Sequence, residues 1–272
     1  MVRIGLIGVG AIGRYILDGV RRGEAGAVQV VGVADVPAAE AKRREVADAA
    51  GCAWTTEPVG LVGLGAELVV EAASQAAVRE HAIPVLEAGA DILVMSVGAL
   101  ADGAFLGDLA AAAERCGRRV HVPSGAIGGL DVLRSARAAG LDEVTLTTSK
   151  PPRALVGAPY LAARGLDVAA VRERTVVFEG PAAEAVRHFP ANVNVAATVA
   201  LAGVGPERTT VRVVADPGLS RNVHELHARG AFGELTLRLA NLPSPANPKT
   251  SLLACLSPLA LIRRLAEPIQ VG

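Results

Sequence analysis

The sequence predicts an α/β chain with a doubly wound parallel sheet in its N-terminal domain and a second, α+β domain after it. In residues 1–122, short apolar runs alternate with helical patterns, as in a parallel sheet wrapped by helices. From residue 123, short alternating strands and turns take over, which predicts a second domain over residues 123–249. We expect the final helical segment, about residues 250–272, to pack back onto the first domain.

The first domain is expected to alternate strands with helices along the chain. The predicted strands are Arg3–Ile7, Val28–Ala34, Leu68–Ala72, Asp91–Met95 and Arg119–Val122. The predicted helices are Ala11–Arg21, Ala38–Ala50, Gln75–Ala88 and Ala104–Cys116. Because a helical segment separates most of these strands from the next, they are expected to run parallel.

The second domain has a different pattern. The predicted strands are Glu143–Ser149, Arg174–Glu179, Val211–Ala215, Val223–Ala228 and Leu235–Ala240, with an apolar helix over Asn192–Ala202. From Thr209 onward, turns at 216–218 and 229–233 predict an antiparallel sheet. One face of this sheet should be covered by helices and the other open towards a cleft.

Composition excludes several classes of protein. The 27 basic and 27 acidic residues form no long run of either sign, so the basic stripe of a nucleic-acid binder is missing. The three cysteines are far apart, which argues against a disulfide framework and a zinc cluster and fits a reducing cytoplasm. The apolar stretch Ser251–Ile262 contains Pro258 and is too short to cross a bilayer. We therefore expect a cytoplasmic protein with no membrane segment and no metal site.

A glycine-rich motif follows the first predicted strand directly and opens the first helix. Its residues are Gly8, Val9, Gly10, Ala11, Ile12 and Gly13, the spacing G-x-G-x-x-G. The first glycine permits a tight turn, the second lets a pyrophosphate approach the backbone, and the third allows close packing of strand and helix. The N–H groups at the helix start then face the phosphates. The motif predicts a dinucleotide site, whereas a plain glycine turn of another α/β protein is the alternative.

Asp35 closes the second strand, about 20 residues beyond the last glycine, where a carboxylate accepts hydrogen bonds from ribose hydroxyls. A negative charge at this position repels a 2′-phosphate, so NAD is the expected cofactor. Lys42, Arg43 and Arg44 follow closely and could offset that repulsion. NADP therefore remains possible.

Several unusual strings lie in the second half. They are Pro123–Gly129 (PSGAIGG), Thr148–Pro152 (TSKPP), Phe189–Ala196 (FPANVNVA), Arg221–Glu225 (RNVHE) and Asn247–Ser251 (NPKTS). Together with the glycine motif, and in this order, they resemble the L-aspartate dehydrogenase family nearly end to end. The resemblance implies NAD(P)-dependent oxidation of L-aspartate to iminosuccinate, which hydrolyses to oxaloacetate and ammonia or feeds pyridine nucleotide biosynthesis. It also implies cofactor contacts at Ala126 and Asn192 and an active-site histidine at His224.

Strand alternation separates His224 from His227. Along the predicted strand, His224 shares a face with Leu226 and Ala228, whereas His227 shares the other face with charged residues. The first face is the protected one, so His224 is the expected acid/base, a role that suits histidine near neutral pH. A structural histidine is the alternative for any of the five histidines in the chain, and His121 is a weaker candidate at the end of a strand.

The two carboxylates of the implied substrate require cationic partners. Lys150 follows a strand directly and precedes two prolines, which would hold the ammonium group rigidly. A solvated lysine in a turn is an equally good interpretation, and Lys249 and Arg221 are weaker candidates. Asn192 and Asn194 lie at a predicted helix start, where capping is the alternative role. Ala126 lies just beyond a parallel strand, where dinucleotides bind.

Other functions remain open at this point. A homoserine-dehydrogenase-like or dihydrodipicolinate-reductase-like enzyme would have a similar architecture, and so would a non-catalytic NADH-sensing protein. The expected partners are a small dicarboxylic amino acid and a second copy of the chain in a homodimer.

Overall fold

The chain folds into two compact units. The computed structural model describes residues 1–35, 40–189, 193–245 and 247–269. The first unit comprises Met1–Pro123 together with Cys255–Gly272, and the second comprises Ser124–Ala254. Residues from the end of the chain thus belong to the same unit as its start.

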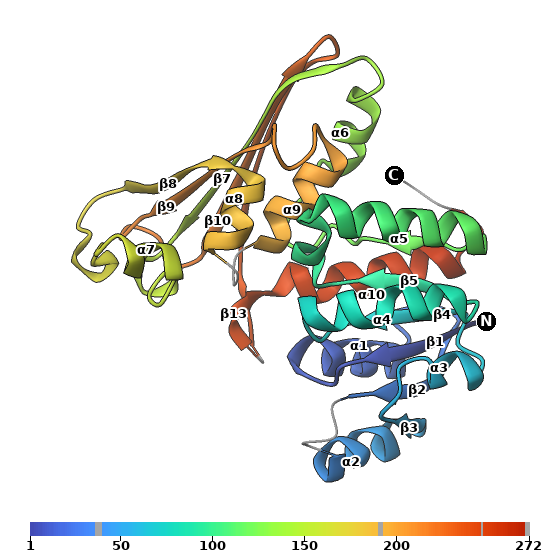
Figure 1. Cartoon of the computed structure of the whole chain (residues 1–272). Coiled ribbons are helices and arrows are strands. Elements are labelled where there is room, and N and C mark those ends of the chain that lie inside the picture. Colours follow the sequence, from blue (N-terminus) through green and yellow to red (C-terminus); the bar gives the residue numbers. More distant parts are fainter. Residues whose placement is uncertain (36–39, 190–192, 246, 270–272) are drawn as a thin grey trace. The chain divides into compact units, whose positions relative to one another are not determined.

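A six-stranded parallel sheet forms the centre of the first unit (Figure 1). Its strands are β1 (Val2–Ile7), β2 (Val28–Ala34), β3 (Ala53–Thr55), β4 (Leu68–Glu71), β5 (Asp91–Val94) and β6 (Val120–His121). Their spatial order is β3-β2-β1-β4-β5-β6, so the direction of winding reverses between β1 and β4. This confirms the predicted doubly wound sheet. The sequence analysis missed β3, because three residues are too few to show a periodicity.

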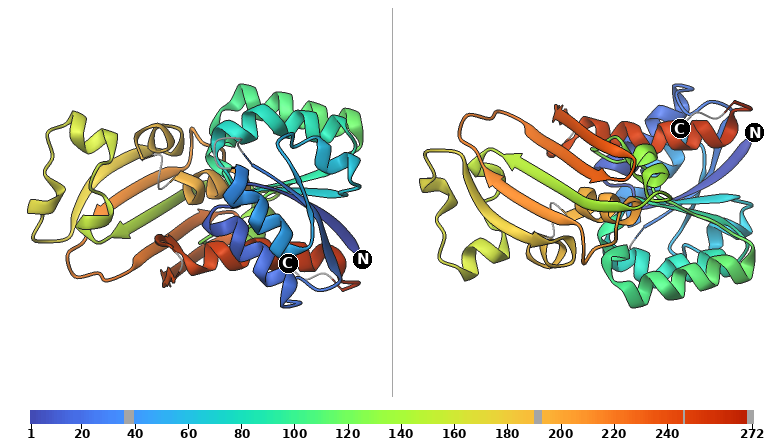
Figure 2. Two further views of the ribbon diagram at one scale, coloured as in Figure 1. Left: turned by 90° about the horizontal axis from the view of Figure 1, so that it is seen from below. Right: turned by 90° about the horizontal axis from the view of Figure 1, so that it is seen from above.

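Helices cover both faces of this sheet. They are α1 (Ala11–Arg21), α2 (Glu40–Ala50), α3 (Gly60–Gly63), α4 (Gln75–Glu87), α5 (Gly103–Cys116), α10 (Leu252–Ala266) and the short 3₁₀ helix η2 (Val97–Ala101). Figure 2 shows α4 and α5 on one face and α1 and α10 on the other. Leu259 and Ile262 of α10 join Ile4, Leu6 and other buried residues in one apolar core. Among the described residues, no helix is both long and apolar enough to traverse a membrane.

The second unit contains a five-stranded sheet of mixed direction. Its strands are β7 (Leu141–Lys150), β8 (Thr175–Pro181), β9 (Thr210–Ala215), β10 (Asn222–Gly230) and β11 (Gly233–Asn241), in the order β11-β10-β7-β9-β8. β9 runs parallel to β7, and the other neighbours are antiparallel. The antiparallel sheet expected from Thr209 onward is therefore a mixed sheet, because β9 lies parallel to β7. The turns predicted local reversals correctly, but β9 pairs with β7 and β8 rather than with β10, the strand that follows it. A small hairpin, β12 (Pro243–Ser244) and β13 (Asn247–Ser251), follows β11.

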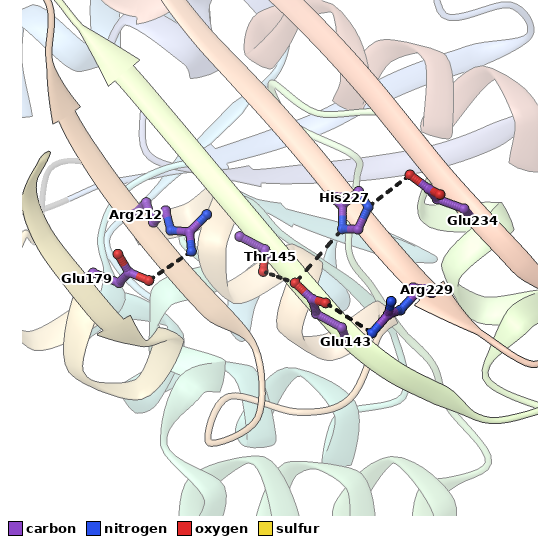
Figure 3. A network of polar contacts seen from close by, with 7 residues as sticks. All are labelled: Glu143, Thr145, Glu179, Arg212, His227, Arg229 and Glu234. Carbon is purple, nitrogen blue, oxygen red and sulfur yellow. Dashed lines mark hydrogen bonds and ion pairs between the residues drawn. The ribbon is translucent and has the colours of Figure 1, made fainter. Parts of the chain in front are cut away.

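The two faces of the mixed sheet differ in chemistry. One face packs an apolar core against the helices α6 (Leu130–Ala136), α8 (Ala182–His188) and α9 (Val193–Ala202). The connection from β7 to β8 contains α7 (Pro159–Ala163) and the 3₁₀ helices η3 (Pro152–Ala154) and η4 (Val168–Ala170). The opposite face bears charged side chains joined by ion pairs (Figure 3). His188 ends α8, and its ring lies 4.8 Å from that of Tyr160.

Candidate active site

The glycine motif in the first unit adopts a geometry that only small residues allow. Gly8 has a φ of 90°, and a Cβ added there would lie 2.8 Å from the carbonyl oxygen of Ala72. A Cβ on Gly13 would overlap the carbonyl oxygen of Gly8, so this glycine permits β1 and α1 to pack closely. A Cβ on Gly10 would meet no atom of the described residues within 4 Å. Gly8 and Gly13 thus serve the fold, while Gly10 leaves open space beside the backbone.

The start of α1 provides the chemistry that a pyrophosphate requires. Ala11 and Ile12 form its first turn, and within the described residues no side chain caps that turn, which leaves its N–H groups for an anion. The side chain of Ile12 packs against the apolar core. Asp35 lies just after β2, and its Oδ2 accepts a hydrogen bond from the Val9 N–H at 2.8 Å. The predicted acidic residue is therefore held directly against the glycine loop.

A buried carboxylate that the sequence analysis did not single out lies at the same edge of the sheet. Glu71 ends β4 and is completely buried. Its oxygens accept hydrogen bonds from the Ala73 N–H at 2.8 Å and from the N–H and hydroxyl of Ser96, each at 2.9 Å. Burial raises the pKa of Glu71, while these hydrogen bonds act in the opposite direction. Glu71 therefore joins the loops that follow β4 and β5, and the first of these loops touches Gly8. A glutamate ending an otherwise apolar strand was the available signal.

A cavity of about 600 Å³ lies elsewhere in the first unit, against Arg3, Gln29, Asp48 and Cys52. These residues lie at or near the amino-terminal ends of β1, β2 and β3. The glycine motif follows the carboxyl end of β1, where dinucleotides bind in sheets of this type. The cavity is therefore not the candidate cofactor site.

In the second unit, a polar pair interrupts the apolar rows of the helix-packed face. Across β7 and β10, Val144 lies opposite Ala228 and Leu146 opposite Leu226, and all four side chains are buried. The next pair on this face is Thr148 and His224, each only 3% exposed. The Thr148 hydroxyl and the His224 Nδ1 are 3.0 Å apart and form a hydrogen bond. The predicted catalytic histidine is thus fixed by a residue that the sequence analysis did not assign.

Lys150 extends this polar row by one further step along β7. It is the last residue of the strand, two positions beyond Thr148 and therefore on the same face. The predicted end of this strand at Ser149 was therefore one residue too early. The Lys150 side chain is buried, which excludes the solvated alternative. Both residues that were predicted to be catalytic therefore neighbour Thr148. His224 lies opposite it on β10, and Lys150 lies two residues further along β7.

Burial controls the charge of both groups. It lowers the pKa of His224 to about 3, and the positive charge of Lys150 acts in the same direction. Burial also lowers the pKa of Lys150 to about 8. At neutral pH the imidazole is therefore uncharged, and most Lys150 side chains still carry a proton. A neutral base beside a cation is an arrangement that suits an anionic substrate.

His227 lies on the opposite face of the same strand, as the alternation predicted. Its Nε2 is 3.0 Å from a carboxylate oxygen of Glu234, and its Nδ1 is 4.0 Å from Glu143 (Figure 3). The side chain of His227 is 39% exposed, whereas the whole of residue His224 is only 3% exposed. This confirms the predicted orientation of both histidines.

Ala126 is buried within the second unit, in the loop that begins it. Its carbonyl oxygen accepts a hydrogen bond from the side-chain amide of Asn241 at 3.0 Å. Asn241 ends β11 and is also buried, so it holds the loop at the position implied for a cofactor contact. Asn241 gave no signal in the sequence.

Asn192 lies outside the described residues, as does the side chain of Lys249. Asn194 and Arg221 are exposed. His121 belongs to the first unit, where its Nε2 is 3.2 Å from a carboxylate oxygen of Asp91. In the described part of the chain, no three His, Cys, Asp or Glu side chains form a group able to hold a metal ion.

A parallel sheet that reverses between β1 and β4, a glycine loop opening α1 and an acidic residue after β2 define an NAD(P)-binding protein. Residues 8–123 match the family described as homoserine dehydrogenase, NAD binding domain, and residues 131–265 match the one described as aspartate dehydrogenase, C-terminal. The chain belongs to the L-aspartate dehydrogenase family.

Full-length relatives support this assignment. The chain is 45% identical to the L-aspartate dehydrogenase of Methanosarcina acetivorans and 41% identical to that of Cupriavidus necator, and each alignment covers both chains completely. The crystal structure of aspartate dehydrogenase from Thermotoga maritima is 30% identical over the whole of both chains and superposes with a TM-score of 0.76. The resemblance found in the sequence is thereby confirmed.

Proposed function

We propose that this protein oxidises L-aspartate with NAD, giving iminosuccinate that hydrolyses to oxaloacetate and ammonia. The observation that carries the proposal is the buried row of His224, Thr148 and Lys150, which lies within the residues that match the aspartate dehydrogenase C-terminal family. It offers a proton acceptor and a cation in one apolar setting, which is what an amino acid with a second carboxylate requires.

The first unit offers a fit for the cofactor. The open space at Gly10 and the uncapped first turn of α1 suit a pyrophosphate, and Asp35 suits the adenosine ribose. The negative charge of Asp35 favours NAD over NADP, because it repels a 2′-phosphate. When bound, the nicotinamide supplies the hydride acceptor for the substrate α-carbon.

His224 acts in this proposal as the acid/base. The α-amino group must be neutral before the α-carbon can release hydride, so an uncharged imidazole takes the proton of the substrate ammonium. Bound carboxylates favour the protonated imidazole, because opposite charges raise the pKa of a base. Lys150 binds one of the substrate carboxylates through a charge-assisted hydrogen bond. After water has added to the imine, the protonated imidazole gives its proton to the amino nitrogen, which leaves as ammonia.

Turnover measurements test the proposed substrate. We expect NAD reduction with L-aspartate, faster at alkaline pH because more of the amine is neutral. In the reverse direction, NADH oxidation with oxaloacetate should require ammonia, which separates amine from alcohol chemistry. L-Alanine lacks the side-chain carboxylate and should be a much poorer substrate. Turnover of homoserine without turnover of L-aspartate, or NADH binding without any turnover, would contradict the proposal.

The two histidines of β10 give a matched test of the mechanism. His224→Ala should lower kcat roughly 10²–10⁴-fold, the usual contribution of general acid–base catalysis, while NADH affinity is retained. His227→Ala changes the same strand on its exposed face and should leave kcat nearly unchanged. Steady-state kinetics with L-aspartate at saturating NAD measures both. A loss of kcat in His227→Ala but not in His224→Ala would show that the acid/base was assigned to the wrong face of β10.

A further inference from the structure

The hydrogen bond between Thr148 and His224 is not required by packing. The two neighbouring pairs on the same face, Val144 with Ala228 and Leu146 with Leu226, are apolar and equally buried. On the other side, His224 pairs with the apolar Leu239 of β11. A valine has nearly the shape of a threonine and would fill the same volume. The hydroxyl of Thr148 therefore needs a reason other than packing.

A neutral imidazole carries one N–H and one lone pair, and its partners decide which nitrogen has which. Thr148 contacts Nδ1 at 3.0 Å, so Nε2 is the nitrogen left for chemistry. If the hydroxyl accepts the Nδ1–H, the lone pair lies on Nε2 and can take a proton. If Nε2 carried the hydrogen instead, the ring could not act as a base through that nitrogen.

We propose that Thr148 is a positioning residue that accepts the Nδ1–H of His224 and so presents the Nε2 lone pair to the substrate. This rests on the proposed function of His224 and names the residue through which that function is set. The proton of the substrate ammonium moves to Nε2, and the Nδ1–H stays on the ring throughout. Thr148 orients the ring as a carboxylate would, but adds no negative charge to a site that must hold a dicarboxylate.

The 3.0 Å contact joins His224 Nδ1 to a hydroxyl and not to a carboxylate, which agrees with the electrostatics of this site. Burial lowers the pKa of His224 far below its ordinary value, and among the described residues the positive charge of Lys150 lowers it further. A hydroxyl partner does not raise the pKa of His224 as a carboxylate would, so the imidazole stays neutral until an anionic substrate binds.

Two substitutions at one position separate orientation from stability. Thr148→Val keeps the shape and removes the hydroxyl, whereas Thr148→Ser keeps the hydroxyl. We expect Thr148→Val to lower kcat roughly 10- to 100-fold, with the KM for L-aspartate and the Kd for NADH little changed, because the ring loses its orientation. Thr148→Ser should restore most of the activity and the pH profile of the natural enzyme. A Thr148→Val enzyme with unchanged kcat would overturn the proposal.

The same two strands provide a control. Thr145 lies opposite His227 just as Thr148 lies opposite His224, but on the charged face of the sheet. Like Thr148 it is a buried threonine, and its hydroxyl donates to Glu143. Thr145→Val makes the same chemical change and should leave kcat unchanged. If Thr148→Val and Thr148→Ser lost activity equally and in parallel with Tm, the role of Thr148 would be structural and the proposal wrong.

A spectroscopic measurement makes the test independent of turnover. In protein labelled with ¹⁵N-histidine, the ring shifts of His224, assigned by their loss in His224→Asn, report the tautomer. We expect a protonated Nδ1 and an unprotonated Nε2 in the natural protein, and a mixture in Thr148→Val. A natural protein with the hydrogen on Nε2 would refute the positioning role, even if L-aspartate is turned over. If L-aspartate were not the substrate, only the turnover measurements would show it, and the tautomer of His224 would be unaffected.

Discussion

At the scale of single residues, Asp35 has two tasks that can be separated. One carboxylate oxygen accepts the Val9 N–H and so shapes the glycine loop. The negative charge is a second property, which we propose selects against a 2′-phosphate. Asparagine retains an acceptor oxygen but has no charge, whereas alanine lacks both.

Asp35→Asn should therefore change the preference between NAD and NADP while the glycine loop keeps its conformation. We expect the ratio of kcat/KM for NADP to that for NAD to rise by about tenfold or more, since one repulsive charge at close range is worth at least about 1.4 kcal/mol. Asp35→Ala should show the same shift together with weaker binding of both cofactors. An unchanged ratio in Asp35→Asn would mean that the carboxylate does not lie beside the 2′-position.

At the scale of elements, the connection from β1 to α1 uses its glycines differently. Gly13 has no room for a side chain, because its Cβ would overlap the carbonyl oxygen of Gly8. Gly10 has open space around it and marks where a ligand can approach the backbone. One glycine thus allows the elements to pack, and the other allows the cofactor to bind.

Gly10→Val and Gly13→Ala should consequently fail in different ways. Gly10→Val should keep a Tm close to that of the natural protein but bind NADH at least about 100-fold more weakly, because the side chain occupies the path of the pyrophosphate. Gly13→Ala should lower the free energy of unfolding by about 1–3 kcal/mol, the usual range for overpacking. Thermal unfolding and NADH titration distinguish the two. Tight NADH binding by Gly10→Val would exclude the glycine loop as the phosphate site.

At the scale of the whole molecule, the buried row of the second unit makes stability depend on pH. The pKa of His224 is lowered from an ordinary value of 6.5 to about 3, so the unfolded chain binds a proton more readily. The contribution of His224 to the free energy of unfolding is present above pH 6.5 and is lost as the pH falls from 6.5 towards 3. The pKa of Lys150 falls from 10.5 to about 8, so its contribution grows as the pH rises from 8 to 10.5. Glu71 has a raised pKa, so its protonation favours the folded state as the pH falls through that value.

Comparison with a variant isolates the histidine from the other groups. Between pH 6 and 4, His224 should reduce the free energy of unfolding by up to about 1.4 kcal/mol per pH unit. His224→Asn should have a shallower slope over this range, because Glu71 and Lys150 contribute equally to both proteins. His227→Asn should retain the natural slope. Denaturant unfolding at several pH values measures the slopes, and identical slopes in all three proteins would disprove the burial of a neutral imidazole at His224.

Local signals in the sequence determined the first unit and part of the second. The strand, glycine turn and helix at the N-terminus are contiguous, so the period of apolar residues and the positions of the glycines suffice to predict them. Alternation along one strand likewise separated His224 from His227, because neighbouring side chains must point to opposite faces. The family resemblance added the chemistry, which no periodicity contains.

Tertiary structure alone decided what these residues contact. Thr148 meets His224 across 76 residues, and Asn241 meets Ala126 across 115. A threonine or asparagine near the end of a strand looks the same in the sequence whichever residue lies opposite. β7 pairs with β10, and β9 lies parallel to β7, because these distant segments pack around one core. Local propensity carries no information about which distant strands pair. The sequence by itself therefore determined most of the strands and the face of β10 on which each histidine lies, whereas packing decided which residues lie beside them.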